Sequence, residues 1–354
     1  MKKGRVKMQN FLKVFLALFI TFSLLSAANA EKTVKELEEL SAMGDIVSQY
    51  NLGYYYYKGE YGLPQDYKKA FEYFLLAASQ DDAEAQLQVA VMYKNGLGTQ
   101  QDIHKAVEFY AKASSHGITS AQYNLAVIYE QDKNYNQAFK YYTLASNAGD
   151  AQAQNNLALM YEQARGTAQD FGKAENLYLK SAASGNVAAQ NNLAGLYAIK
   201  LKEPQKAIEW YIKAANAGVV SAQYNLGVIY DQLQDYKKAF EYYSLAAEKN
   251  NTAAQYNLAI LYEDGKGVEK NYKKAIELYA KAAQSNDSAA QNNLGVLSFH
   301  GADGVEKDYS KAAAYFTLAA KNGNRTAAKN LEELNKPSRV NANIVKESSK
   351  DITR

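Results

Sequence analysis

The sequence predicts an all-α solenoid built from repeated pairs of helices. The main observation is a short motif, Ala-Gln-(Tyr/Asn)-Asn-Leu, which returns along the chain, for example at residues 222–226, 254–258 and 290–294. Its spacing of 32 to 37 residues is typical of a solenoid whose units stack on their neighbours. In each unit, apolar residues also recur twice with helical spacing. Eight copies carry the motif's Gln, and Ala328 replaces it in a ninth: Gln49, Gln86, Gln122, Gln154, Gln190, Gln223, Gln255 and Gln291.

Each unit is predicted to contain two amphipathic helices of about three turns. In the seventh unit they cover residues 252–263 and 271–284. Gly265 and Gly267 lie between them, where glycine can adopt the left-handed conformation that ends a helix. Asn271 is suited to cap the second helix, and Pro204 falls at a first helical position in the fifth unit. Aspartates occupy the capping position in other units: Asp66, Asp102, Asp170, Asp235 and Asp308.

The complete pattern is Ala-x-x-Asn-Leu-Gly-x-x-Tyr, a Gly-x-Gly turn and Asp-Tyr-x-Lys-Ala-x-Glu-x-Tyr-x-x-Ala-Ala-x-x-Gly. Over residues 48–331 it resembles the Sel1-like repeat, a relative of the tetratricopeptide repeat. The resemblance implies a right-handed α/α superhelix and a protein-binding scaffold. Units three, five and six lack the Gly-x-Gly turn and have shorter inter-helix segments at 130–137, 198–206 and 231–238, so they look more like tetratricopeptide units.

The two ends of the chain differ from the repeats. Residues 1–30 combine basic residues, an apolar run at 14–25 and Ala28-Asn29-Ala30, which together predict a secretory signal peptide. The apolar run is shorter than the roughly 20 residues that a membrane-spanning helix needs. Residues 31–45 are expected to form an N-terminal capping helix, and 46–334 the solenoid of eight repeats with a C-terminal half repeat. Residues 335–354 are polar and lack the period, so we expect a flexible tail.

Composition argues against several classes of function. The chain has 40 Lys and Arg residues, five of them in the first 30, so 35 remain against 37 Asp and Glu after removal of a leader. A near-neutral chain lacks the charge typical of nucleic-acid binding. It has no cysteine, and its histidines, His104, His116 and His300, lie in different units without metal-ligand spacing. We therefore expect no catalytic site, metal or cofactor.

In several units an acidic residue directly follows the tyrosine that ends the Ala-x-x-Asn-Leu-Gly-x-x-Tyr pattern of the first helix. Recurrence at successive units is unlike a pair of differently tuned catalytic carboxylates. We interpret these residues as a solvated acidic strip: Glu130, Glu162, Asp231 and Glu263.

By the same resemblance, the first helices line a concave groove and expose the residue that precedes the motif's Leu. That residue is nearly always Asn, whose amide can hold the N–H and C=O of an extended peptide, as in the asparagine ladder of O-linked N-acetylglucosamine transferase. In an alternative interpretation, Asn bonds the neighbouring unit and the adjacent Tyr covers it. The motif's Gln is interpreted as structural. The predicted partner-binding groove comprises Asn51, Gln88, Asn124, Asn156, Asn192, Asn225, Asn257 and Asn293, with Tyr123, Tyr224 and Tyr256.

The function expected from this resemblance is that of an exported bacterial scaffold or adaptor of the cell envelope. Its partners would be other proteins, from the envelope or outer membrane or from a host, and it would support envelope signalling or host interaction and virulence. It would reside in the periplasm or at the outer membrane. A secreted host-directed effector is an alternative, and a cell-wall or β-lactam hydrolase is a less favoured one.

Overall fold

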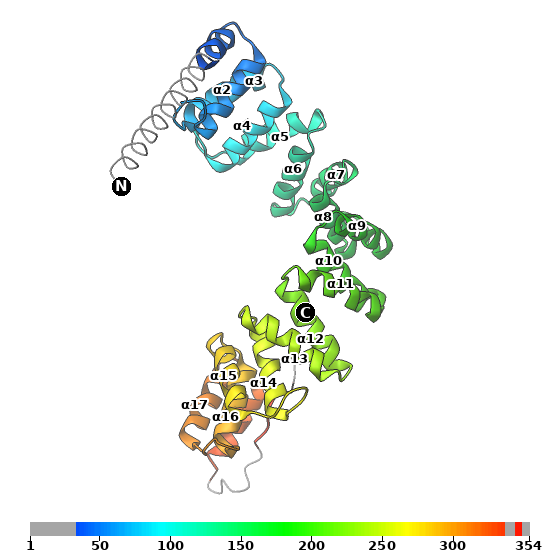
Figure 1. Cartoon of the computed structure of the whole chain (residues 1–354), viewed down its shortest axis with the longest axis vertical. Coiled ribbons are helices and arrows are strands. Elements are labelled where there is room, and N and C mark those ends of the chain that lie inside the picture. Colours follow the sequence, from blue (N-terminus) through cyan, green and yellow to red (C-terminus); the bar gives the residue numbers. More distant parts are fainter. Residues whose placement is uncertain (1–32, 337–343, 349–354) are drawn as a thin grey trace, which may run out of the picture. The chain divides into compact units, whose positions relative to one another are not determined.

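The computed structural model describes residues 33–336 and 344–348 and confirms the predicted all-α solenoid (Figure 1). The predicted signal peptide lies outside the described residues. The described residues form two compact units, one that ends at Asp170 and one that begins at Phe171. In each, consecutive helices pack as neighbours. Within the described part of the chain, no helix is long and apolar enough to cross a membrane.

In the first unit, a helix over residues 33–42 precedes the repeats, at the place predicted for the capping helix. The repeat helices that follow have 13 residues each, or about three and a half turns. They are α2 (Ile46–Lys58), α3 (Tyr67–Ser79), α4 (Ala83–Asn95), α5 (Ile103–Ser115), α6 (Thr119–Gln131), α7 (Tyr135–Asn147) and α8 (Ala151–Gln163).

The second unit continues the same alternation of helices. One first helix is irregular, because a π-helical turn, η1 (Leu196–Leu201), follows α10 (Val187–Gly195). The other helices are α9 (Phe171–Ala183), α11 (Pro204–Asn216), α12 (Val220–Gln232), α13 (Tyr236–Glu248), α14 (Thr252–Asp264), α15 (Tyr272–Gln284), α16 (Ser288–His300), α17 (Tyr309–Lys321) and α18 (Arg325–Leu334).

The predicted helix ends are confirmed at several positions. Asp66 accepts hydrogen bonds from the backbone N–H groups of Lys68 and Lys69 at the start of α3, both at 3.0 Å. Asn271 caps α15 in the same way, and Pro204 is the first residue of α11. These caps satisfy N–H groups that a helix leaves without internal partners.

The two glycines of the Gly-x-Gly turn have different roles. Gly265 is the left-handed cap of α14, as predicted. Gly267 also has a positive φ, of 71°, but a Cβ there would lie 2.1 Å from the carbonyl oxygen of Tyr236, in the second helix of the preceding repeat. A Cβ on Gly98 would likewise lie 2.0 Å from the carbonyl oxygen of Tyr67. The second glycine therefore permits close packing between repeats, beyond the helix termination expected of it.

The core of each repeat combines small residues with one large aromatic ring from the second helix. Leu193 in α10, with none of its surface exposed, is a core residue of a first helix. The aromatic residues occupy one register and are at most 2% exposed, and we call them the second-helix aromatic column: Phe74, Tyr110, Tyr142, Tyr178, Tyr211, Tyr243, Tyr279 and Phe316.

Several of the motif's glutamines have the structural role predicted for them. The Gln223 side chain donates from Nε2 to the carbonyl oxygen of Ala215, at 3.3 Å. Gln291 makes the same bond to Ala283 at 3.1 Å. Each bond joins a first helix to the end of the preceding second helix, so it fastens consecutive repeats together.

Candidate functional site

The asparagines that precede the motif's Leu, which we call the Asn column, contact the second-helix aromatic column. Asn225 Nδ2 donates to the Tyr211 hydroxyl at 3.1 Å. Asn156 makes the same bond to Tyr142 at 3.0 Å, Asn257 to Tyr243 at 3.1 Å, and Asn293 to Tyr279 at 3.4 Å. Each tyrosine belongs to the repeat before the asparagine. These four asparagines therefore bridge neighbouring repeats, as the alternative interpretation expected.

The other members of the Asn column are placed differently. Asn124 in α6 donates to the backbone oxygen of Ser120 at 2.8 Å and accepts from Lys94 Nζ at 3.4 Å. Asn51 in α2, Gln88 in α4 and Asn192 in α10 are half-buried. The column is thus regular in sequence, while its side chains do not all make the same contacts.

The three predicted tyrosines lie on first helices beside the second-helix tyrosine of their own repeat. The ring of Tyr256 is centred 5.7 Å from that of Tyr279, and those of Tyr123 and Tyr224 are each 6.0 Å from their neighbours. Tyr123 and Tyr224 are half-buried, whereas Tyr256 is fully buried. The tyrosines therefore pack beside the Asn column and leave part of their surface accessible in two repeats.

An acidic residue completes the contact at Tyr279 and at Tyr142. The Tyr279 hydroxyl donates to Glu263 Oε2 at 2.7 Å, and the Tyr142 hydroxyl donates to Glu130 Oε2 at the same distance. Glu263 is only 9% exposed, so the expectation of a solvated acidic strip is wrong at this residue. Burial, together with the neighbouring carboxylate, raises the pKa of both tyrosines. Their hydroxyls therefore stay protonated and remain donors to the acid.

This arrangement fixes the orientation of the Asn293 amide. Because the Tyr279 proton is directed to Glu263, the hydroxyl oxygen is free to accept from Asn293 Nδ2. The nitrogen of the amide is thereby turned toward the preceding repeat. One N–H group and the Oδ1 atom of Asn293 remain available for a ligand on the surface formed by the first helices.

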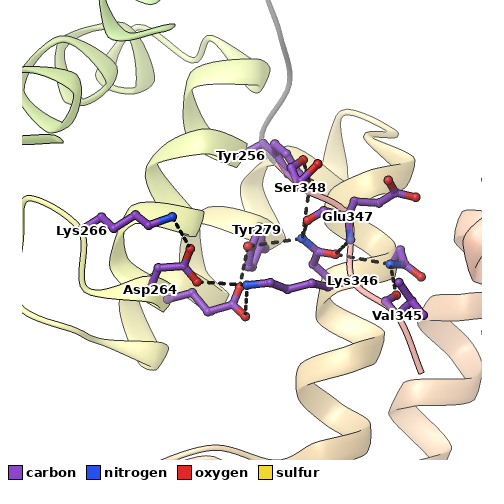
Figure 2. Close-up of polar contacts among 11 residues, drawn as sticks. Tyr256, Asp264, Lys266, Tyr279, Val345, Lys346, Glu347 and Ser348 are labelled. Carbon is purple, nitrogen blue, oxygen red and sulfur yellow. Dashed lines mark hydrogen bonds and ion pairs between the residues drawn. The ribbon is translucent and has the colours of Figure 1, made fainter. Parts of the chain in front are cut away.

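In the second unit, residues 344–348 of the chain occupy that surface across α14, α16 and α18 (Figure 2). Asn293 Oδ1 accepts from the backbone N–H of Glu347 at 2.8 Å, and Asn293 Nδ2 donates to the carbonyl oxygen of Glu347 at 3.1 Å. Asn330 holds Val345 by the same two groups, at 2.9 and 2.8 Å. One side-chain amide thus satisfies both backbone groups of one residue, twice in succession.

Further contacts hold the same residues, which we call the docked segment (344–348). The Tyr256 hydroxyl donates to the carbonyl oxygen of Ser348 at 2.8 Å, and Lys346 Nζ lies 3.2 Å from Glu263 Oε1 and 3.0 Å from Asp264 Oδ1. This part of the predicted flexible tail is instead held against the repeats. The polar surface supplies partners for its backbone groups, which would otherwise remain solvated.

Asn330 was not among the predicted site residues. It lies two positions after Ala328, just as Asn293 lies two positions after Gln291, so it belongs to the Asn column of the ninth, incomplete copy. Ala328 replaces the Gln that marks the other copies, which obscured this register. Counting from the motif's Leu, here Leu331, would have revealed it.

The described side chains that meet at this surface are amides, tyrosines and the acidic pair with Lys346. All three histidines are exposed, and His116 Nε2 lies 3.1 Å from Asp81 Oδ1. Among residues 33–336 and 344–348, no group of three or more His, Cys, Asp or Glu side chains is arranged to hold a metal ion.

Comparison with known families accounts for the repeats. A model of the Sel1 repeat matches eight consecutive stretches: residues 46–82, 83–118, 119–150, 151–186, 187–219, 220–251, 252–287 and 288–324. The chain belongs to the Sel1 repeat family. Every Sel1 repeat begins at the first residue of a first helix, from α2 to α16. Sel1 repeats generally form non-catalytic scaffolds for protein–protein interaction.

Two of the solved structures that resemble this Sel1 protein show the same fold. One is a protective antigen present in uropathogenic Escherichia coli strains, which has the Sel1-like repeat fold, with 31% identity and a TM-score of 0.76 over 84% of this chain. The chain spans 66% of that protein's length. The other is a Sel1 repeat protein from Oxalobacter formigenes, with 26% identity and a TM-score of 0.62, covering 77% of this chain and 81% of that one. No curated protein matches the chain.

Proposed function

We propose that this Sel1 protein is an exported interaction scaffold of the bacterial cell envelope, and that its Asn column binds extended segments of other proteins. The observation that carries the proposal is the pair of contacts made by Asn293 and Asn330, each of which holds both backbone groups of one residue. Val345 and Glu347 are two positions apart, which is the side-chain period of an extended chain.

Backbone recognition suits a scaffold because every extended segment presents the same N–H and C=O groups. Each such bond contributes about 0.5–1.5 kcal/mol, so several rungs together give useful affinity with little dependence on sequence. Asn156 and Asn225 are half-buried and are oriented by the same bond to a second-helix tyrosine. They are therefore suited to the same contact with a partner.

Export is proposed from the basic leader, the short apolar run and the Ala-x-Ala site of residues 1–30. A similar solved protein is a protective antigen of a bacterial pathogen, and this similarity supports a location outside the cytoplasm. The proposed partners are envelope or outer-membrane proteins. Host proteins are a second candidate class of partner, which the similarity to a protective antigen of a pathogen favours. Binding to them would give this Sel1 protein a role in host interaction and virulence.

Photo-crosslinking in cells tests this function directly. A photoreactive phenylalanine analogue at Tyr224 places the crosslinker beside the Asn column, and the same analogue at Leu245 places it on an exposed position of α13 as the matched control. We expect partner proteins to be captured from Tyr224 and not from Leu245, and we expect their yield to fall when Asn225 is replaced by Ala. Equal capture from both positions would contradict an interaction through the Asn column.

Fractionation separates the locations. The mature protein is expected to begin at Glu31 and to be recovered with the periplasm or outer membrane. Recovery in the culture medium with crosslinked host proteins would identify a secreted effector. Recovery in the cytoplasm with Met1 intact would contradict export.

A further inference from the structure

The docked segment (344–348) places a lysine between its two Asn-bound residues. Lys346 Nζ lies between the carboxylates of Glu263, which is buried, and Asp264, at the end of α14 (Figure 2). Val345 and Glu347 direct their backbone groups to the asparagines. Successive side chains of an extended segment alternate between its two faces, so the Lys346 side chain lies on the face opposite to those of Val345 and Glu347.

We propose that the surface formed by α14, α16 and α18 selects extended segments with a basic side chain between two Asn-bound residues, and that the docked segment (344–348) occupies this surface until such a partner displaces it. The inference rests on the proposed function and adds the chemistry of the partner. It also gives the chain's own C-terminal segment a regulatory role at the site.

The acidic pair is suited to select charge, whereas the amides are not. Asn293 and Asn330 contact only backbone atoms of Val345 and Glu347, so they accept nearly any residue there. By contrast, the Glu263 side chain is only 11% exposed and that of Asp264 is 27% exposed. An acidic or neutral group in place of Lys346 would leave the Glu263 carboxylate without its counterion and that of Asp264 with Lys266 alone.

The pKa shifts agree with this geometry. Burial lowers the pKa of Lys346, but the two carboxylates more than offset it, and the net pKa is raised. Burial alone would raise the pKa of Asp264, yet its bonds to Lys346 and Lys266 bring it below the usual value. The docked contact therefore keeps both partners charged.

The docked segment (344–348) hydrogen-bonds both polar groups of the Asn293 amide, which is 1% exposed. A partner that uses Asn293 must therefore first remove residues 344–348 from it.

Full-length variants without the leader can release the segment by a change to its backbone alone. Val345→Pro with Glu347→Pro removes the two N–H groups that donate to Asn330 and Asn293. Ser348→Pro is the matched control, because it leaves both of those N–H groups in place. The probe is a fluorescent peptide of residues 341–351, whose binding is followed by anisotropy.

We expect the doubly substituted chain to bind this peptide at least about tenfold more tightly than the wild-type or Ser348→Pro chain does. Equal binding by all three would overturn occupation of the site. Among peptides, replacing the central lysine with Arg should preserve binding, and replacing it with Ala or Glu should weaken it by at least about fivefold. Equal affinity for the Lys and Ala peptides would overturn charge selection.

A charge exchange gives independent evidence for the contact. Asp264→Lys in the doubly substituted chain should abolish the preference for Lys, and a peptide with Asp at that position should then bind better.

Light scattering should find the wild type monomeric at all concentrations tested, whereas a dimer that dissociates in the doubly substituted chain would place the segment on a second copy. Partner capture at Tyr224 does not depend on these residues, so the proposed function and this inference can fail separately.

Discussion

Asn293 satisfies both backbone groups of Glu347 while its own amide nitrogen lies 3.4 Å from the Tyr279 hydroxyl of the preceding repeat. The two interpretations of the Asn column are therefore compatible at this residue. The tyrosine orients the amide, and the oriented amide binds a peptide. Asn225, with the tyrosine contact but outside the docked segment, separates the two roles experimentally.

Replacing Asn330 or Asn293 by Ala should release the docked segment. Each asparagine supplies two hydrogen bonds to it, so the amides of Val345 and Glu347 should exchange with solvent at least about tenfold faster. Hydrogen exchange followed by NMR measures these two amides. Asn225→Ala, the control, should leave both rates unchanged, and a similar increase in that variant would mean that the effect spreads through the repeats.

Gly267→Ala should be far more destabilising than Gly265→Ala. Both positions have a positive φ, so backbone strain destabilises both variants. Only at Gly267 does the new Cβ meet backbone, 2.1 Å from the Tyr236 oxygen, whereas at Gly265 the nearest atom is the Lys270 Cβ at 3.2 Å. We expect Gly265→Ala to cost about 1 kcal/mol and Gly267→Ala several times as much. Urea unfolding of the two variants gives the comparison, and equal losses would refute close packing between repeats at Gly267.

Tyr279→Phe should cost more stability than Tyr211→Phe, although both hydroxyls are buried. The Tyr279 hydroxyl donates to the buried carboxylate of Glu263, and its loss should cost about 1.5–3 kcal/mol. The Tyr211 hydroxyl accepts from Asn225, and its loss should cost about 0.5–1.5 kcal/mol. Thermal and urea melts of both variants test the order. The reverse order would show that Glu263 does not depend on Tyr279.

Stability should fall at alkaline pH as buried tyrosines ionise. Burial raises the pKa of Tyr110 and Tyr211 from 10.0 to about 12. The unfolded chain loses these protons near pH 10 and the folded chain only near pH 12, so their contribution is complete below pH 10 and is lost as the pH rises toward 12. Circular dichroism should report unfolding together with the rise in tyrosinate absorbance. Ionisation near pH 10 without unfolding would place these hydroxyls in solvent.

The repeats could be predicted from sequence because one motif returns at a fixed register. Pro204 and Asn271 both lie where the capping preferences predicted. The docked segment (344–348) could not be predicted in this way. Its binding uses backbone atoms, which are the same in every sequence, so residues 335–354 carried no periodic signal. The role of Glu263 was hidden for a related reason, because it contacts Lys346, which lies 83 positions away in the sequence.

The covalent link between the docked segment and its site changes what an external partner must do. Two groups on one chain meet at an effective concentration on the order of millimolar, without any diffusion from solution. A partner that matched only residues 344–348 would need a similar concentration to compete. A partner that also binds Asn225, which is half-buried, gains contacts outside the docked segment, and so can displace it at a much lower concentration. The chain's own terminus thereby sets a minimum length for the ligands that this surface accepts.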